Sequence, residues 1–148
     1  MLQLKMRTVA LALSLTLIAA AAAAAAAADP VQGDWVNPNG AAKIRIGPCP
    51  AQPQEMCGVV AAIRDPAAAR ARDVNNVDPA LKGRPMLGMP VLYGFKRDKP
   101  GRWTGGKVYA AKKGTTFDGV LTIRPDDTLK VEACVLPMVC SVQTWTRN

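Results

Sequence analysis

The chain has 148 residues, and its 19 Lys and Arg residues outnumber its 11 Asp and Glu residues, which gives a formal net charge of +8 at pH 7. This length predicts a single domain. The chain has no histidine, which excludes a Ser-His-Asp hydrolase and any zinc site built with histidine. Aromatic residues make up 5% of the chain, too few for a base-stacking platform, so we expect no nucleic-acid binding.

The first 28 residues have the pattern of a secretory signal peptide. Lys5 and Arg7 form a positive segment, residues 9–18 are strongly apolar, and a run of alanines follows. A membrane anchor is the less favoured alternative, because the strongly apolar part is only about ten residues long. We therefore expect export to the periplasm or the outside of the cell, cleavage near residue 28, and no stable membrane span in a single domain at residues 29–148.

Four cysteines in an exported chain predict two disulfides. Of the three possible connectivities, we favour the local pairs Cys49–Cys57 and Cys134–Cys140, since each closes a short loop at the end of a strand. Each bridge should stabilise the fold by about 2–3 kcal/mol. A four-cysteine zinc site is disfavoured because metal-binding cysteine pairs are usually more closely spaced.

The first two predicted strands form a hairpin. Residues 33–36 are short and extended, and Asn39-Gly40 after them is the strongest short hairpin signal, because both residues accept positive φ. Residues 42–46 then alternate between apolar and basic side chains, as expected for a strand with one face in water.

A third strand is predicted at residues 57–63, and the connection after it, from residue 64 to about 85, is the longest in the chain. Its first part contains good helix formers and favours a helical turn or two. Asp78-Pro79 has the cap and the proline that begin a single helical turn. Connections of this length are usually Ω-loops, lids or binding loops; the alternative is a plain cover that plugs one end of the fold.

The remaining sequence predicts five more strands separated by short turns. These strands are residues 86–96, 102–110, 115–123, 129–135 and 141–147. Gly105-Gly106, inside the second of them, indicates a bulge or a close approach of two backbones.

Eight strands with no long amphipathic helix to cover them must bury one face against themselves. Closure into an eight-stranded antiparallel up-and-down barrel does this and removes the sheet edges. An open sandwich of the same strands is the alternative fold. The interior of an eight-stranded barrel is just large enough for side chains or for one small ligand.

Five short motifs connect this chain to a known family. They are GDW at 33–35, CG at 57–58, NNVDPALKGRPMLGMPVLYGF at 75–95, WTGGKVY at 103–109 and QTWTR at 143–147. With these motifs in this order, the chain resembles the DUF2147 family of exported bacterial proteins, a domain of unknown function. The resemblance implies a compact lipocalin-like (calycin-like) barrel in the periplasm and implies no established activity.

The chain departs from the family pattern at two places. Val77 stands where a proline usually follows the Asn pair, which should leave that loop less rigid. Ala110-Ala111 stands where an Asp-Pro or a similar pair commonly follows the tyrosine, so no role proposed for that acid carries over.

Gly33-x-Trp35 also resembles the signature on the first strand of lipocalin-type barrels. In that group an arginine from the last strand lies across the tryptophan, and Arg147 is the matching candidate here. A guanidinium on an indole face contributes roughly 0.5–2 kcal/mol, so this pair should tie the first strand to the last. We expect its role to be structural.

Polar and aromatic residues near the long connection and two strands form a candidate ligand site: Asn75, Asn76, Asp78, Arg84, Trp103 and Tyr109. They could line the rim of a small-ligand pocket, where a few polar groups orient a ligand above an apolar cup. In the alternative, structural reading, Asn75 and Asn76 satisfy the backbone of their own loop and Arg84 pairs with Asp78. Calcium is not expected, because the glycine and the distal glutamate of an EF-hand are missing.

These observations favour a non-enzymatic protein with no catalytic residues, no metal and no cofactor. The first hypothesis is a carrier for a small apolar or amphipathic ligand, held in a barrel cavity that opens near residues 75–85. The alternative is a solid barrel in the cell envelope that meets an acidic partner through its basic surface. Removing Lys5 and Arg7 lowers the net charge from +8 to +6, so the mature chain remains basic.

Overall fold

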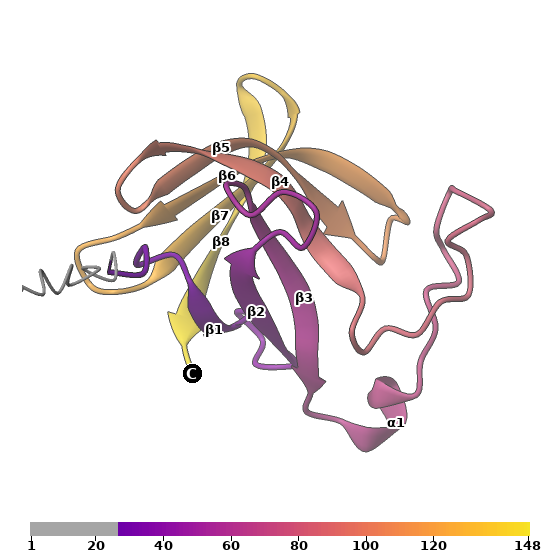
Figure 1. Cartoon of the computed structure of the whole chain (residues 1–148). Helices are drawn as coiled ribbons and strands as arrows, with labels where there is room; N and C mark the ends of the chain where they lie inside the picture. The colour runs from indigo at the N-terminus through magenta and orange to yellow at the C-terminus, as the bar shows by residue number, and fades with distance from the viewer. Residues whose placement is uncertain (1–26) are drawn as a thin grey trace, which may run out of the picture.

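Eight antiparallel strands form a closed barrel in which each strand pairs with the next and the last returns to the first (Figure 1). The computed structural model describes residues 27–148, so nearly all of the predicted signal peptide lies outside the described residues. Within that part of the chain, no helix has the length and apolar character needed to cross a membrane. The predicted up-and-down barrel is confirmed, and the open sandwich is not the fold.

The strands are β1 Gly33–Val36, β2 Ala42–Pro48, β3 Met56–Ile63, β4 Pro90–Lys99, β5 Arg102–Ala110, β6 Thr115–Ile123, β7 Leu129–Leu136 and β8 Val139–Arg147. One short helix, α1 Pro66–Ala69, begins the long connection between β3 and β4. The Asp65 carboxylate accepts a 2.9 Å hydrogen bond from the backbone N–H of Ala67 and caps this helix.

Several strand boundaries differ from those predicted, among them the starts of the fourth and eighth strands. The fourth strand begins at Pro90 rather than at residue 86, because the residues before Pro90 belong to the long connection, where Gly88 donates a hydrogen bond to the carbonyl of Val60. The eighth begins at Val139 rather than at residue 141, because β7 and β8 stay paired beyond the second cysteine pair.

Side chains fill the middle of the barrel. Trp35, Leu92, Phe95, Leu121 and Leu129 are fully buried there. The aromatic ring of Phe95 depends on two glycines that face each other on β5 and β6, since a Cβ atom at Gly106 or Gly119 would overlap it. The predicted bulge at Gly105-Gly106 is also present: Gly105 has φ +70° and the strand register shifts beside it.

Arg147 ties the first strand to the last at one end of the barrel. Its guanidinium carbon lies 4.2 Å from the centre of the Trp35 ring, as the resemblance of Gly33-x-Trp35 to the lipocalin-type signature implies. Its Nε and Nη2 atoms donate 2.9 Å hydrogen bonds to the two carboxylate oxygens of Asp127, and Nη2 also donates to the carbonyl of Pro30. The Trp35 indole N–H donates to the carbonyl of Val31 at 2.9 Å. Three segments of the chain, at residues 30–31, Asp127 and Arg147, are therefore held around one tryptophan.

The cysteines form the two predicted pairs. The S–S distance is 2.01 Å for Cys49–Cys57 and 1.96 Å for Cys134–Cys140. The described residues contain no free cysteine.

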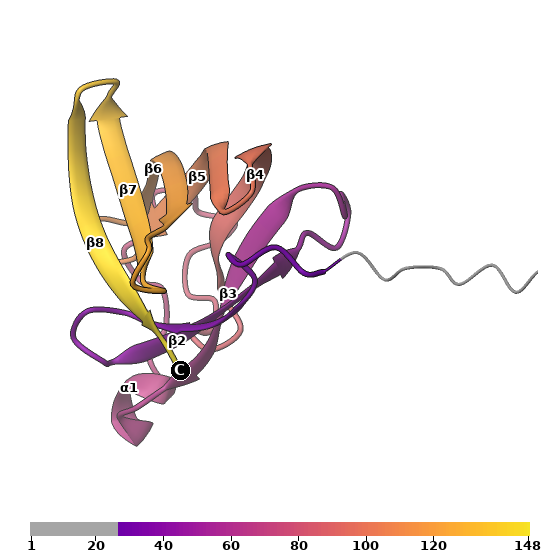
Figure 2. The same cartoon turned by 90° about the vertical axis from the view of Figure 1, so that its left-hand side faces the viewer.

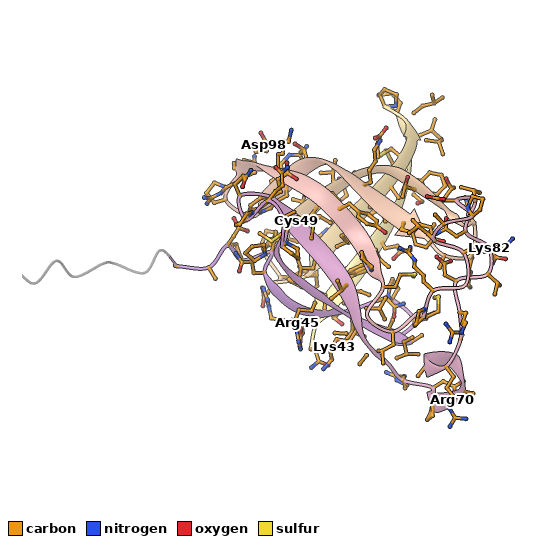
Figure 3. The ribbon with its side chains drawn as sticks, turned by 45° about the vertical axis from the view of Figure 1, so that its right-hand side comes forward. Lys43, Arg45, Cys49, Arg70, Lys82 and Asp98 are labelled. Carbon is orange, nitrogen blue, oxygen red and sulfur yellow. A yellow bond between two sulfur atoms is a disulfide. The ribbon has the colours of Figure 1, made fainter. Side chains whose placement is uncertain are left out.

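The basic residues are spread over the surface rather than gathered into one patch. Figure 3 shows Lys43 and Arg45 on one side of the barrel, with Arg70 and Lys82 on the long connection. Several of these charges are neutralised locally; Arg45, for example, donates a 2.8 Å hydrogen bond to Asp34 on the neighbouring strand.

Candidate functional site

The long connection forms a closed loop with a narrow neck. Arg72 pairs with Pro85 in a single antiparallel bridge, and the backbone N–H of Asp73 donates to the carbonyl of Arg84 at 2.9 Å. The backbone N–H of Gly83 donates to the carbonyl of Asp73 at 2.8 Å. A loop whose two ends are bonded together in this way is the Ω-type connection that its length predicts. We call residues 72–85 the Ω-loop.

One helical turn forms inside the Ω-loop, beginning at Asp78 as predicted. The Asp78 carboxylate accepts a 2.9 Å hydrogen bond from the N–H of Ala80, and the Asp78 carbonyl accepts from the N–H of Lys82 at 3.1 Å. The Asp78 carboxylate is thus used as a cap for its own turn.

The Ω-loop covers the outer face of the barrel wall. Leu92 and Val108 are partners on neighbouring strands and both pack in the core. Because side chains alternate along a strand, Tyr93 and Tyr109 must point to the outer face. Tyr109 is nevertheless only 6% exposed, since the Ω-loop lies over it. The Ω-loop therefore covers the outer wall of the barrel at Tyr109.

Asp73 holds the Ω-loop to this wall. Its carboxylate is buried and accepts three hydrogen bonds, from the Tyr109 hydroxyl at 2.5 Å, from Asn76 Nδ2 at 2.9 Å and from Arg84 Nε at 3.1 Å. Burial alone would raise the pKa of Asp73, but the bonds from Tyr109, Asn76 and Arg84 outweigh it, so the pKa lies below its usual value. Asp73 is consequently ionised at neutral pH.

Tyr109 is affected in the opposite direction. Burial, followed by the hydrogen bond to the Asp73 carboxylate and its negative charge, raises the pKa of Tyr109 to about 12. Its hydroxyl therefore stays protonated near neutral pH. The guanidinium of Arg84 lies over the Tyr109 ring, 5.1 Å from its centre, and completes a compact group of three side chains.

A glycine lets the Ω-loop approach the β5–β6 turn. Gly114 has φ +69°, and a Cβ atom there would overlap the backbone carbonyl of Asn75. The carbonyl of Gly114 accepts a 2.8 Å hydrogen bond from the N–H of Val77. A side chain at this position would push the Ω-loop away from the barrel wall.

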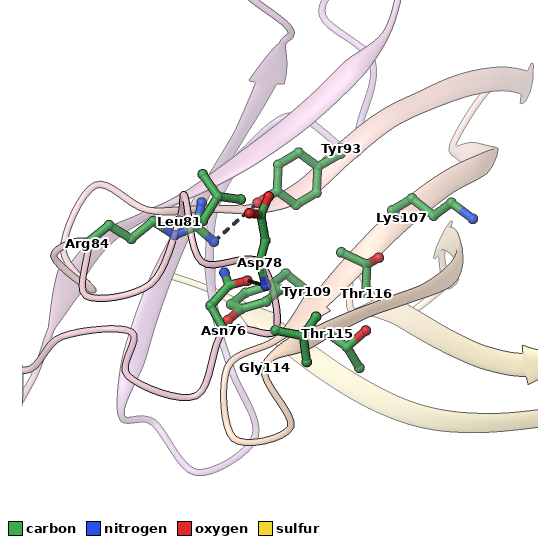
Figure 4. Close-up of a pocket in the computed structure, with 11 residues that line it drawn as sticks. Asn76, Asp78, Leu81, Arg84, Tyr93, Lys107, Tyr109, Gly114, Thr115 and Thr116 are labelled. Carbon is green, nitrogen blue, oxygen red and sulfur yellow. Dashed lines mark hydrogen bonds between the residues drawn. The ribbon is translucent and has the colours of Figure 1, made fainter.

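A cavity of about 320 Å³ lies between the Ω-loop and the outer wall (Figure 4). One side is formed by the Ω-loop and the other by β4, β5 and the start of β6. The lining residues are Asn76, Val77, Asp78, Leu81, Arg84, Tyr93, Lys107, Tyr109, Gly114, Thr115 and Thr116. Its volume is at the lower end of the range of small-molecule sites.

Two of the three charged side chains in this lining already have partners of opposite charge within the chain. Arg84 is paired with Asp73, and Lys107 lies 2.6 Å from Asp118. The Asp78 carboxylate forms no ion pair among residues 27–148. The cavity therefore offers one uncompensated negative charge, together with hydroxyl groups and apolar surface.

The structure brings together four of the six residues predicted for the site. Asn76, Asp78, Arg84 and Tyr109 line the cavity. Asn75 lies outside the lining, exposed, with a 3.5 Å contact from its Nδ2 to the carbonyl of Lys112. The sixth residue, Trp103, belongs to the core of the barrel at 6% exposure.

The predicted pairing of Arg84 with Asp78 is wrong. Arg84 bonds to Asp73, which stands directly across the neck of the Ω-loop, whereas the Asp78 carboxylate caps its own helical turn. Asn76 does satisfy its own loop, because its Oδ1 accepts a 2.9 Å hydrogen bond from the N–H of Asp78.

Sequence reasoning missed Asp73, Tyr93, Lys107 and the two threonines as parts of this site. Strand alternation was the signal available for Tyr93, Lys107 and Thr116, which share the outer face with Tyr109. Nothing in the sequence marks Asp73 as buried. Within the described part of the chain, no group of three or more His, Cys, Asp or Glu side chains is placed to hold a metal ion.

Comparisons with known proteins agree with this geometry at the level of the fold. The sequence model of a family described as "Uncharacterized protein conserved in bacteria (DUF2147)" matches residues 33–147. Among solved structures, the chain is similar to one described as "Protein HP1028 from the human pathogen Helicobacter pylori belongs to the lipocalin family", with a TM-score of 0.68. The two are 16% identical, and the similarity covers 79% of this chain and 82% of that one. No curated protein matches the chain.

Proposed function

Because this chain belongs to the DUF2147 family of uncharacterised bacterial proteins, we propose a function from the site itself: an exported, non-enzymatic barrel that binds a small amphipathic molecule between the Ω-loop and the outer wall. The observation that carries this proposal is the 320 Å³ cavity whose two walls are fastened to each other by buried hydrogen bonds. The described relative is a lipocalin-family protein, a likeness that is compatible with ligand binding at the level of the fold.

Preorganisation favours binding at this place. The Asp73 carboxylate, the Tyr109 hydroxyl and the Arg84 guanidinium fix the Ω-loop before any ligand arrives. Because the Ω-loop is already ordered, the free energy of ligand binding does not have to offset the entropic cost of ordering it. The loop residues that face the cavity, such as Val77 and Leu81, are then available for contact.

The chemistry of the lining favours an apolar body with a hydrogen-bond-donating or cationic head. Val77 and Leu81 are 69% and 41% exposed, and they line the cavity beside the rings of Tyr93 and Tyr109. Covering such surface is favourable at roughly 25 cal/mol per Å². Asp78 is the only charged group of the lining without an ion-pair partner among residues 27–148, so it is the natural acceptor for an amine or a hydroxyl group.

The structure moves the expected ligand position from the inside of the barrel to its outer wall. The barrel axis contains large buried side chains, among them Trp35, Phe95 and Leu92. The predicted cavity inside the barrel is therefore wrong, and the cavity lies instead between the Ω-loop and the outer wall. The two disulfides support export, because such bonds persist in oxidising compartments.

Absence of catalysis is part of the proposal. Asp73 is ionised and fully hydrogen-bonded, and Tyr109 stays protonated far above neutral pH. Neither group is poised for proton transfer, since a general acid or base works best with a pKa near the operating pH.

The test uses two tryptophan substitutions in the same connection. Leu81→Trp fills the cavity from its rim, whereas Leu87→Trp adds the same bulk at a residue that is 47% exposed and outside the lining. Native mass spectrometry of each protein, purified from the exported fraction, reports retained small molecules. We expect wild type and Leu87→Trp to carry the same added mass and Leu81→Trp to lose it. Equal retention by all three proteins, or none by wild type after incubation with amphipathic amines, would refute the proposal.

The filled barrel axis favours a second candidate, an envelope protein that meets an acidic partner through its basic surface. Binding to anionic vesicles that weakens steeply with salt would support this candidate. Such binding should be insensitive to Leu81→Trp, which separates it from ligand binding in the cavity.

A further inference from the structure

Strand β8 is paired along most of its length on one edge and only at its end on the other. It pairs with β7 from Val139 to Trp145, but with β1 only at Thr146 and Arg147. The reason is that β1 has only four residues and the chain turns away after Val36, at the Asn37-Pro38 turn. Residues Val139 to Thr144 therefore present an edge whose outward-facing backbone groups have no backbone partner among residues 27–148.

The register identifies which backbone groups are free. Asn148 donates a hydrogen bond to the carbonyl of Asp34, so even-numbered residues at the end of β8 turn their backbone groups toward the β1 side. The same alternation continues toward the start of β8. The backbone N–H and C=O groups of Thr144, Val142 and Cys140 therefore point to the free edge.

The hairpin that carries this edge is apolar and uncharged. Residues 133–144 contain no charged side chain. Half of the large hydrophobic side chains that are exposed among residues 27–148 lie here: Val135 at 55%, Leu136 at 63%, Met138 at 93%, Val139 at 54% and Val142 at 51%. Figure 2 shows β7 and β8 extending beyond the ends of their neighbours. The edge lacks the charges and prolines with which proteins usually block edge-to-edge pairing.

We propose that this edge pairs with the same edge of a second copy of the chain, extending the sheet across a two-fold axis. An antiparallel strand pair is self-complementary, so one edge can serve both copies. In the arrangement that uses the free groups, Val142 faces Val142 of the other copy, and Cys140 faces Thr144 of the other copy.

Two observations favour a second copy over other occupants. A lipid bilayer would cover the apolar tip but would leave the backbone groups of the edge without hydrogen bonds, which is costly in hydrocarbon. An acidic partner would find little complementary charge, because Lys130 is paired with Glu132 at 2.9 Å and Arg124 is the one further basic side chain in contact with the edge, where its Nη1 donates a 2.9 Å hydrogen bond to the Thr144 hydroxyl. A second copy supplies both the hydrogen bonds and an apolar surface, and residues 133–144 of the two copies bring no like charges to the contact.

The size of the edge predicts a weak association. Six strand residues span about 20 Å, which corresponds to the low end of specific interfaces. The dimer should therefore form in the micromolar to millimolar range and be invisible in dilute solution.

Sedimentation velocity of the mature chain over about 10 µM to about 1 mM, a range suited to small interfaces, tests the proposal. We expect the sedimentation coefficient of wild type to rise with concentration. Val142→Lys, which places a charge on the edge, should raise the dissociation constant at least about tenfold. Val59→Lys makes the same change at a valine that is 36% exposed on β3 and should leave association unchanged. Thr144→Lys gives a second edge variant if Val142→Lys folds poorly.

Amide hydrogen exchange, measured at the lowest and the highest of these concentrations, distinguishes edge pairing from non-specific hydrophobic association of the β7–β8 hairpin. The proposal requires concentration-dependent protection of the Cys140, Val142 and Thr144 amides, with Ser141 and Gln143 unchanged. Protection confined to Leu136 and Met138, a monomer at all concentrations, or co-sedimentation with neutral vesicles in place of dimer formation would each overturn it.

Discussion

The hydroxyl of Tyr109 donates a 2.5 Å hydrogen bond to the carboxylate of Asp73, a residue 36 positions earlier in the chain. This contact joins the outer face of β5 to the neck of the Ω-loop. It makes the loop and the barrel wall one rigid unit, and the cavity exists because the two are held together there.

Replacing the buried carboxylate should loosen that unit. In Asp73→Asn, the new amide N–H group would face either the two donors of Arg84 and Asn76, which share one carboxylate oxygen, or the Tyr109 hydroxyl at the other oxygen, and Arg84 would lose its counter-ion. We expect a loss of about 2–3 kcal/mol in the free energy of unfolding, below the value for a fully buried pair because Arg84 is partly solvated. Urea denaturation followed by circular dichroism measures it.

Asp118→Asn is the matched control for this loss. Its partner Lys107 and its own carboxylate are both exposed, so removing this ion pair should cost less than about 1 kcal/mol. Equal losses in the two variants would contradict the central role of Asp73.

Alkaline pH should weaken the same contact. Because the pKa of Tyr109 is about 12 in the folded chain and about 10 when unfolded, its contribution is fully present below pH 10 and is lost as the pH rises toward 12. The stability difference between wild type and Tyr109→Phe should therefore shrink by about 2 kcal/mol between about pH 9 and about pH 11.5. A constant difference would show that the hydroxyl does not titrate abnormally. The effects of the other groups that titrate at alkaline pH cancel in this difference, because both proteins contain those groups.

The arginine that holds the first and last strands together should not be replaceable by lysine. Arg147→Ala removes the contact with Trp35 and both hydrogen bonds to Asp127, and it should cost about 1–2 kcal/mol. Arg147→Lys keeps the charge but cannot form the bidentate hydrogen bonds to Asp127. We therefore expect lysine to restore less than half of the stability that Arg147→Ala loses. Thermal unfolding followed by tryptophan fluorescence gives the comparison, and full recovery by lysine would argue for simple charge attraction.

A single methyl group on one glycine should disturb the core. Gly106→Ala puts a Cβ atom into the space of the Phe95 ring, and we expect a loss of about 1–3 kcal/mol from overpacking. Gly47→Ala is the control, because a Cβ atom there meets nothing and its φ is not in the left-handed region. Comparable midpoints for the two variants in chemical denaturation would contradict the packing argument.

The fold was accessible from sequence because it depends on local patterns. Each of these patterns indicates the backbone conformation of the residues that carry it. Examples are the alternation of residues 42–46, the turn at Asn39-Gly40 and the adjacent glycines at 105–106. The cysteine spacing predicted both disulfides for the same reason. The barrel then follows from the number of strands and the lack of any helix to cover them.

The site was only partly accessible because it depends on contacts between distant residues. Asn76, Asp78, Arg84 and Tyr109 were found from their chemistry and from their nearness to the long connection. The partner of Arg84 could not be found, since the choice between Asp73 and Asp78 is made by the bonded neck of the Ω-loop. Trp103 was misplaced because its outward or inward direction depends on the bulge at Gly105, which shifts the strand register.

The most direct test of the proposed site is chemical-shift mapping of the isotopically labelled mature chain with a matched pair of probes, octylamine and octanoate. We predict that octylamine shifts the amide signals of residues 76–84, Tyr93, Tyr109 and 114–116 and binds more tightly than octanoate, a preference that Asp78→Asn abolishes. Shifts centred on the barrel axis around Phe95, or an equal response to the two probes in wild type, would contradict the account.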